Sequence, residues 1–167
     1  MDRRAFASLN CITVVPGAVG AWRKDVLVEA GGFPSDTLAE DQDLTLRVRR
    51  LGYRIGYEED AIAWTEAPHN LRSLAKQRFR WAYGTLQCMW KHRDALFRPR
   101  YGALGFIAMP NVWIFQILIA LISPVMDLML VYLLVANALD RWQQPTGYSS
   151  TNLQQVLFYY ALFLAID

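Results

Sequence analysis

The stretch AEDQDLTLRVRRLGYR, residues 39–54, joins a cluster of acids to the apolar spacing of an amphipathic helix. Leu44, Val48 and Leu51 recur at intervals of four and three residues, so they share one face of a helix. Gly52 follows directly, and glycine is a common stop signal after the last helical turn. We therefore predict a helix that begins near the acids and ends at Leu51.

The expected helix begins around Ala39, and its first turn carries the carboxylates of Glu40, Asp41 and Asp43. The backbone dipole favours negative charge at a helix N-terminus, so an aspartate there stays ionised and can act as a base. Acids are also common in first turns for stability alone, and this stretch by itself favours that interpretation. Asp43 lies about 200° around the helix from Asp41, so we expect it to matter far less for chemistry.

Short strand and helix patterns alternate on both sides of this helix. β-Branched runs favour strands, whereas apolar periodicity, an Asn cap and Gly stops favour helices. The expected strands are Ile12–Val15, Tyr53–Tyr57 and Ala61–Thr65, and the expected helices are Trp22–Ala30 and Leu71 to about Arg93. The mixture predicts an α/β domain over residues 1–100. Few strands and no early Asp-x-Asp pair favour the second half of a larger domain.

A long apolar segment runs from Tyr101 to Leu139 and exceeds the roughly 20 residues that span a bilayer. We expect residues 101–109 to be an interfacial lead-in and a transmembrane helix to follow Pro110, within residues 101–139. Asp127 inside it could snorkel, pair within a bundle or be functional. The alternative is that the run forms buried core helices of a soluble protein.

The charge distribution predicts an orientation in the membrane. Of the 17 Lys and Arg residues, 16 lie at or before Arg100. The positive-inside rule therefore puts residues 1–100 in the cytoplasm and the polar loop 140–155 outside. Residues 156–167 resemble the truncated start of a second transmembrane helix, which predicts a multi-pass membrane protein. Two cysteines are too few for a disulfide framework, and no signal peptide is recognisable.

The sequence AKQRFRWAYG, residues 75–84, places Gln77, Arg80 and Trp81 on one helical face. Arginine binds phosphate oxygens with a planar fork, a Trp ring packs on the C–H face of a sugar, and Gln bonds either group. The set fits a sugar phosphate better than a bare lipid headgroup. The alternative is a basic interfacial helix that holds the membrane surface.

Taken together, the acidic stretch and the QRFRW stretch 36 residues after Asp41, followed by a membrane segment, resemble the processive family 2 glycosyltransferases. These are the membrane synthases of cellulose, chitin, hyaluronan and poly-N-acetylglucosamine. The resemblance covers roughly residues 11–136 and implies the second half of a GT-A (Rossmann-like) catalytic domain followed by transmembrane helices.

The resemblance also implies roles for particular residues. Asp41 corresponds to the general base and Glu40 to its neighbour in the Glu-Asp pair. Gln77, Arg80 and Trp81 match the family's Gln-x-x-Arg-Trp motif, which binds substrate. The segment PGAVGAWRKDVLVEAGGF resembles the family's segment before the base; its small-residue turn near the substrate contains Gly17 and Ala18.

Two departures from the family pattern matter. Many members have Thr before the Glu-Asp pair, where this chain has Ala39. The Asp-x-Asp that holds a divalent metal, Mg²⁺ or Mn²⁺, is absent, so the resemblance implies that the metal ligands and most uridine contacts lie upstream of Met1. The 167-residue chain is therefore not expected to be active alone.

The expected function is inverting transfer of a sugar from a UDP-sugar to a growing β-linked glycan at the bilayer, with N-acetylglucosamine weakly favoured. Two alternatives stay open. One is a truncated or degenerate relative that binds but does not catalyse. The other is a nucleic-acid or lipid-surface binder that uses the Arg-rich helices; we do not expect nucleic acid to be a partner.

Overall fold

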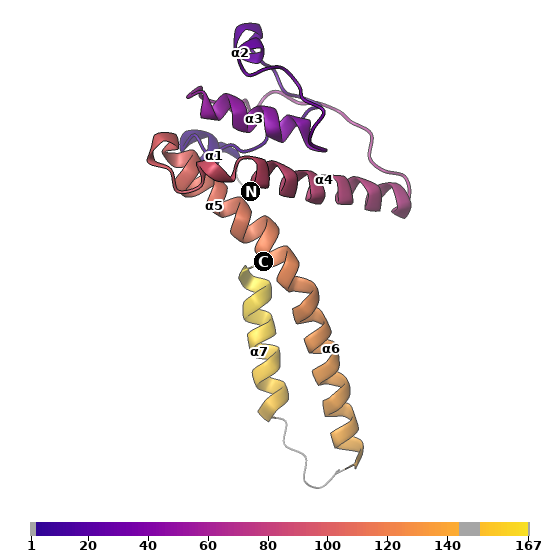
Figure 1. The fold of residues 1–167 in the computed structure, drawn as a ribbon. Coiled ribbons are helices and arrows are strands. Elements are labelled where there is room, and N and C mark those ends of the chain that lie inside the picture. Colours follow the sequence, from indigo (N-terminus) through magenta and orange to yellow (C-terminus); the bar gives the residue numbers. More distant parts are fainter. Residues whose placement is uncertain (1–2, 144–150, 167) are drawn as a thin grey trace. The chain divides into compact units, whose positions relative to one another are not determined.

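The computed structural model describes residues 3–143 and 151–166, which form two compact units, Met1–Trp113 and Ile114–Asp167. Figure 1 shows their elements. The first unit contains α1 (Arg3–Ser8), α2 (Lys24–Glu29), α3 (Glu40–Arg50), α4 (Leu71–Lys91), η1 (Arg93–Ala95), η2 (Pro99–Tyr101), η3 (Leu104–Ala108) and α5 (Met109–Asn111). The π-helical η4 (Val112–Leu118) leads into α6 (Ile119–Gln143), and α7 (Thr151–Ile166) follows in the second unit.

The helix α3 confirms the prediction from the acidic stretch to within a residue at each end. Ala39 is its N-cap residue and Leu51 its C-cap residue. Leu44 and Val48 are buried, as the apolar spacing indicates, whereas Leu51 is 46 % exposed. The apolar face is therefore one turn shorter than the sequence pattern, because Leu51 lies at the turn where the chain leaves the helix.

The side chains of Leu44 and Val48 pack with Val26 and Ala30 of the α2 segment to form a small apolar core. The guanidinium of Arg47 donates to the carbonyl oxygens of Ala30 and Gly32, the latter at 2.6 Å. These carbonyls lie just past the end of α2, where helical partners run out, so one arginine caps α2 and joins it to α3.

The helix α4 begins where the Asn cap predicts. The Asn70 side-chain oxygen accepts the Ser73 N–H at 2.8 Å, and the helix continues for 21 residues. This length makes α4 the longest element of the first unit, and it carries the whole Gln-x-x-Arg-Trp motif.

The three predicted strands are wrong for the part of the chain that the structure describes. Residues 12–15, 53–57 and 61–65 form no strand ladder, and the described elements are helical. A strand exists only where a neighbouring strand supplies its hydrogen bonds, and at Val15 and Ile55 the partners are side chains instead. The Val15 N–H, for example, donates to Thr45 Oγ1 at 3.0 Å. The α/β class is thus not confirmed by these residues.

The apolar segment forms a continuous helical run, Leu104–Gln143, and it is the one helix among the described residues that is long and apolar enough to cross a membrane. It begins before Pro110, so part of the expected lead-in is already helical. Wide π-helical turns lie on either side of Pro110, which lacks an N–H donor and cannot fit a regular α-helical ladder. The apolar window of this run is not buried by other parts of the chain.

In the second unit α6 and α7 lie side by side (Figure 1). The Tyr160 hydroxyl of α7 donates to Asp127 Oδ1 of α6 at 2.6 Å. Of the three possibilities for Asp127, the structure therefore favours pairing between helices. The expected loop 140–155 is shorter than predicted, since α6 reaches Gln143 and α7 begins at Thr151; residues 144–150 lie outside the described residues.

Candidate active site

Asp41 is the second residue of α3, and its carboxylate is held by backbone donors. Its Oδ2 accepts the Gly17 N–H at 3.1 Å, and its Oδ1 accepts the Gln42 N–H at 2.8 Å. Among the described residues no cation forms an ion pair with it. A half-buried carboxylate that two N–H groups orient, and that no arginine or lysine neutralises, is suited to accept a proton.

The small-residue turn lies directly against this carboxylate. Thr45 links them, because its hydroxyl accepts the Val15 N–H at 3.0 Å and donates to the Asp41 carbonyl oxygen at 2.6 Å. The turn is closed by the Val19 N–H, which donates to the Pro16 carbonyl at 3.1 Å. Within it, Gly17 contacts Asp41 and Ala18 is exposed. The structure thus brings Gly17 into contact with the predicted base, whereas no contact joins Ala18 to it among the described residues; Glu40 is exposed at the start of the helix.

The helix α4 contacts the backbone directly before the Glu-Asp pair. Gln87 Oε1 accepts the Leu38 N–H at 3.0 Å, and the Cys88 thiol donates to the Ala39 carbonyl at 3.4 Å. A Cβ atom added at Gly84 would lie 2.7 Å from Ala39 Cβ and 2.8 Å from its backbone nitrogen. Glycine at 84 therefore permits a close approach of α4 to the N-terminus of α3.

Gly84→Ala should destabilise the protein, because the new methyl group meets backbone atoms of residues 38 and 39 that cannot move independently. Overpacking of this kind typically costs about 1–3 kcal/mol. We expect a lower melting temperature of the complete gene product in detergent. Gly56→Ala is the matched control, since nothing lies within 4 Å of its added Cβ; a loss as large in Gly56→Ala would contradict the contact.

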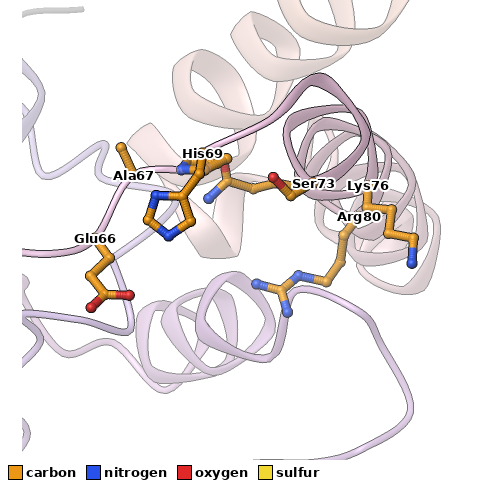
Figure 2. Close-up of a pocket in the computed structure, with 8 residues that line it drawn as sticks. Glu66, Ala67, His69, Ser73, Lys76 and Arg80 are labelled. Atoms are coloured by element: carbon orange, nitrogen blue, oxygen red, sulfur yellow. The ribbon is translucent and has the colours of Figure 1, made fainter.

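The Gln-x-x-Arg-Trp residues lie on α4 as the helical spacing predicts. Gln77 is half-buried, whereas Arg80 and Trp81 are exposed. Gln77 and Arg80 line an open pocket of about 460 Å³ (Figure 2). The rest of its lining comes from the first turns of α4 and the segment before it: Glu66, Ala67, Pro68, His69, Ser73 and Lys76.

Figure 2 shows the Arg80 guanidinium pointing into this pocket, on the same side as His69, while the Lys76 ammonium points away. Within the described part of the chain Arg80 has no hydrogen-bond or ion-pair partner, so its planar fork is available to an anionic ligand. Trp81 is 48 % exposed, and the Arg78 guanidinium lies 5.1 Å from the centre of its ring. The Trp81 ring therefore lies beside the Arg78 guanidinium, and about half of the side chain remains open to solvent.

Asp41 on α3 and Gln77, Arg80 and Trp81 on α4 lie near the contact between Gly84 of α4 and Ala39 at the start of α3. Asp41 follows Ala39 by two residues, while Arg80 and Trp81 precede Gly84 by about one helical turn, or roughly 5 Å along the axis. No hydrogen bond among the described residues joins Asp41 to Gln77, Arg80 or Trp81. Asp41 is not among the residues that line the pocket of Gln77 and Arg80.

Asp43 corrects one expectation from the sequence. Its side chain is fully buried, where it pairs with Arg47 Nε at 2.9 Å, Lys91 Nζ at 2.9 Å and His92 Nε2 at 2.8 Å. It does point away from Asp41, as helical spacing requires, but it lies at the centre of the packing of α3 against the end of α4. Asp43 therefore matters for structure, and sequence spacing gave no sign of that.

Acid should weaken the fold through Asp43. Burial raises the pKa of Asp43, but hydrogen bonds from His92 and Lys91 outweigh it and lower the pKa from 3.8 to about 2. A depressed folded-state pKa stabilises the protein above about pH 4, and this stabilisation, on the order of 2 kcal/mol, is lost as the pH falls toward 2.

We expect the melting temperature of the wild type to fall between about pH 4 and pH 2 and that of Asp43→Asn to change less over the same window. Asp25→Asn is the control, because Asp25 is an exposed carboxylate paired with Arg23. If Asp43→Asn kept the full acid sensitivity of the wild type, the assignment would be wrong.

The Mg²⁺ or Mn²⁺ implied by the resemblance stays a prediction, since its ligands are expected upstream of Met1 and not among the residues that the structure describes. These described residues contain no group of three His, Cys, Asp or Glu side chains that could hold a metal ion. The Asp43 carboxylate already contacts Arg47, Lys91 and His92, and the Asp41 carboxylate accepts two backbone N–H groups.

Sequence reasoning missed the pocket residues His69 and Ser73. A signal for Ser73 was present, because it lies four residues before Gln77 and so shares its helical face. His69 precedes the helix cap, where the chain direction does not follow from periodicity, and only the folded structure places it at the pocket.

Comparison with known proteins adds independent information. The chain is 36 % identical over 87 residues to "Probable glycosyltransferase YdaM" of Bacillus subtilis (52 % of this chain, 21 % of the relative). It is 38 % identical over 84 residues to "Probable glucomannan 4-beta-mannosyltransferase 6" of Oryza sativa subsp. japonica (50 % and 15 %). It is 32 % identical over 82 residues to the poly-beta-1,6-N-acetyl-D-glucosamine synthase of Staphylococcus aureus strain COL (49 % and 20 %).

The chain thus spans about a fifth of the length of these relatives. No solved structure matches it significantly. The sequence model of glycosyl transferase family group 2 matches residues 1–143, which include Asp41, the small-residue turn and the Gln-x-x-Arg-Trp face. The chain therefore belongs to glycosyl transferase family group 2.

Proposed function

We propose that this chain supplies the acceptor side and the general base of an inverting glycosyltransferase, which moves a sugar from a UDP-sugar to a growing β-linked glycan. The observation that carries the proposal is the Asp41 carboxylate. Two backbone N–H groups fix it beside an exposed turn, and no cation within the described chain neutralises it. The relatives named as glycosyltransferases support the same reaction class.

In the proposed reaction Asp41 takes the proton from the acceptor hydroxyl. The hydroxyl oxygen forms a bond to the anomeric carbon of the donor, and the bond from that carbon to the diphosphate oxygen breaks. The electron pair leaves with UDP. A single displacement with a base and no covalent intermediate inverts the anomeric centre, so an α-linked donor gives a β-linked product.

The α4 pocket fits the departing diphosphate. The Arg80 guanidinium points into it (Figure 2), and Gln77 also lines it, so together their side chains can offer several N–H donors to anionic oxygens. Trp81 follows Arg80 on the helix and is about half exposed, and we place the terminal sugar of the acceptor on its ring. Glu40, exposed beside the base, is placed with the substrate-binding residues.

The sugar is proposed to be N-acetylglucosamine, the sugar in the name of the Staphylococcus aureus relative. The test is sugar transfer by the complete gene product in membranes, with a panel of donors that carry N-acetylglucosamine, glucose, glucuronic acid or mannose. Incorporation from the N-acetylglucosamine donor is expected. Transfer from another donor would correct the sugar, and binding of donors without any transfer would favour a non-catalytic relative.

We further propose a multi-pass membrane protein with the site in the cytoplasm. The apolar run Leu104–Gln143 supports a membrane location by its length and composition. A cysteine at Ser149, which lies outside the described residues, should react with an impermeant thiol reagent in intact cells. A cysteine at the exposed Ser35 should react only after lysis. The native Cys11 and Cys88 are buried and should interfere little; the reverse pattern would overturn the orientation.

A further inference from the structure

Lys91, the last residue of α4, forms ion pairs with residues on both sides of the Glu-Asp pair. The Lys91 ammonium lies 2.8 Å from Asp36 Oδ2 and 2.9 Å from Asp43 Oδ1. These carboxylates come five residues before Asp41 and two residues after it. One cation thus ties down both flanks of the proposed base while leaving Asp41 itself unpaired.

His92, the next residue, is 3 % exposed, and its ring accepts one hydrogen bond and donates another. Its Nδ1 lies 2.9 Å from Arg50 Nη1, which can only donate, so Nδ1 must accept. Its Nε2 lies 2.8 Å from Asp43 Oδ1 and therefore carries the proton and donates. The network fixes one neutral tautomer of the ring.

Arg50 is itself held in place on the far side of this ring. Its guanidinium bonds both Asp94 carboxylate oxygens, at 2.9 and 2.6 Å, and reaches the Tyr101 hydroxyl at 3.2 Å. His92 is therefore not a side chain that merely fills space. It is the middle of a chain of hydrogen bonds that runs from the η1 and η2 turns to the buried Asp43.

We infer that His92 is a positioning residue for the proposed transfer reaction. By donating to Asp43, it keeps the first turn of α3, and with it Asp41, in fixed register against α4. The inference rests on the proposed function for its catalytic meaning. The claim that His92 holds α3 against α4 rests only on its hydrogen bond to Asp43 and on the ion pair of Lys91 with the same carboxylate.

The register matters because the base and the Gln-x-x-Arg-Trp face lie on different helices. They flank the contact of Gly84 with Ala39, so a slide or tilt of α3 changes the distance between the proton acceptor and the sugar-binding side. A misplacement of about 1 Å can cost on the order of a hundredfold in rate even when the residue responsible is remote. Substrate binding by α4 alone would be affected much less.

Two substitutions of His92 by an amide residue test the roles of its two ring nitrogens, Nδ1 and Nε2, separately. His92→Gln places an amide nitrogen near the position of Nε2, so the donor to Asp43 is retained. His92→Asn reaches only to the position of Nδ1, so the donor to Asp43 is lost although size and polarity are similar. If His92 acts as the hydrogen-bond donor to Asp43, His92→Gln and His92→Asn should behave differently; if it only fills space, they should behave alike.

In the complete gene product, His92→Asn should lower kcat for sugar transfer by on the order of tenfold to a hundredfold while leaving KM for the donor within about threefold. His92→Gln should retain most of the wild-type kcat. Equal losses in both variants, at equal amounts of folded protein, would overturn the inference, and so would near-normal kcat in His92→Asn.

A second readout does not depend on activity. Cys88 is buried against the Ala39 carbonyl, and burial raises its pKa to about 11, so it should react slowly with alkylating reagents at neutral pH. Mass spectrometry of the peptide that contains Cys88 measures whether α4 has moved from α3. Alkylation should speed up in His92→Asn and stay slow in His92→Gln; unchanged protection in both would overturn the inference.

Lys91 gives a second pair of variants in case His92→Asn does not fold. Lys91→Met removes the link between Asp36 and Asp43, whereas Lys91→Arg keeps a cation that can reach both. Faster Cys88 alkylation in Lys91→Met alone is expected, and equal protection in the two would count against the inference. If the wild type transferred no sugar from any donor, the proposed function would fail, while the alkylation result would still decide the role of the cluster.

Discussion

Replacing Asp41 with asparagine should reduce sugar transfer by a factor of about 10² to 10⁴, the usual contribution of a positioned general base. The change removes the basic oxygen and keeps the size of the side chain. One amide oxygen can still accept the Gly17 N–H, which lies 3.1 Å from Oδ2 in the wild type. Fold and UDP binding should therefore survive. The measurement is transfer from labelled donor in membranes, with UDP binding assayed separately.

The control for this variant is Asp25→Asn. Asp25 is also the second residue of its helix, α2, but it is exposed and pairs only with Arg23 among the described residues. Asp43→Asn does not serve as a neutral control, because Asp43 is buried and holds α3 to α4. Near-normal transfer by Asp41→Asn would remove the base assignment, and an equal loss in Asp25→Asn would point to damage to the fold.

Trp81→Ala should strongly reduce polymer formation while UDP binding stays largely intact, because the ring is assigned to the acceptor sugar. Removal of an aromatic side chain on which a nucleic-acid base stacks typically costs about 1–3 kcal/mol of binding energy. The same loss for the acceptor sugar would lower its affinity roughly five- to 150-fold. Trp81→Phe keeps a flat face and should be milder. The two variants are compared by polymer yield and by UDP binding in the same membranes.

Trp90→Ala is the matched control for the loss of a large ring. Trp90 is on the same helix and 61 % exposed, but nine residues further on its side chain points about 180° away from that of Trp81. Near-normal transfer is expected. If Trp81→Ala abolished UDP binding and spared use of the acceptor, the division of roles between Trp81 and Arg80 would be wrong.

The helices α2, α3 and α4 of the first unit could be predicted from the sequence because their signals are local, whereas α1 and the short helical turns after α4 were not predicted. The Asn70 cap, the glycines after α2 and the spacing of Leu44 and Val48 each act within a few residues, and the structure confirms all of them. Helical spacing alone placed Gln77, Arg80 and Trp81 on one face, whereas the role of Asp41 as a base came only from the family resemblance and stays a prediction.

The three predicted strands are wrong and the buried polar cluster could not be predicted, because both depend on partners distant in sequence. Val15 looks like a strand residue, but its N–H donates to the side chain of Thr45. Asp43 looks like a solvated acid in a first turn, yet His92, 49 residues away, buries it. No periodicity within either segment carries this information.

The close contact of Gly84 with residues 38 and 39 has a consequence for how relatives can diverge. An added Cβ at position 84 would meet not only the Ala39 side chain but also the Ala39 nitrogen and the Leu38 carbonyl carbon, at 2.8 and 3.1 Å. These backbone atoms are present whatever side chain stands at 39. A change of residue 39 therefore cannot make room for a side chain at 84, so position 84 should remain glycine in every family member that shares this helix contact.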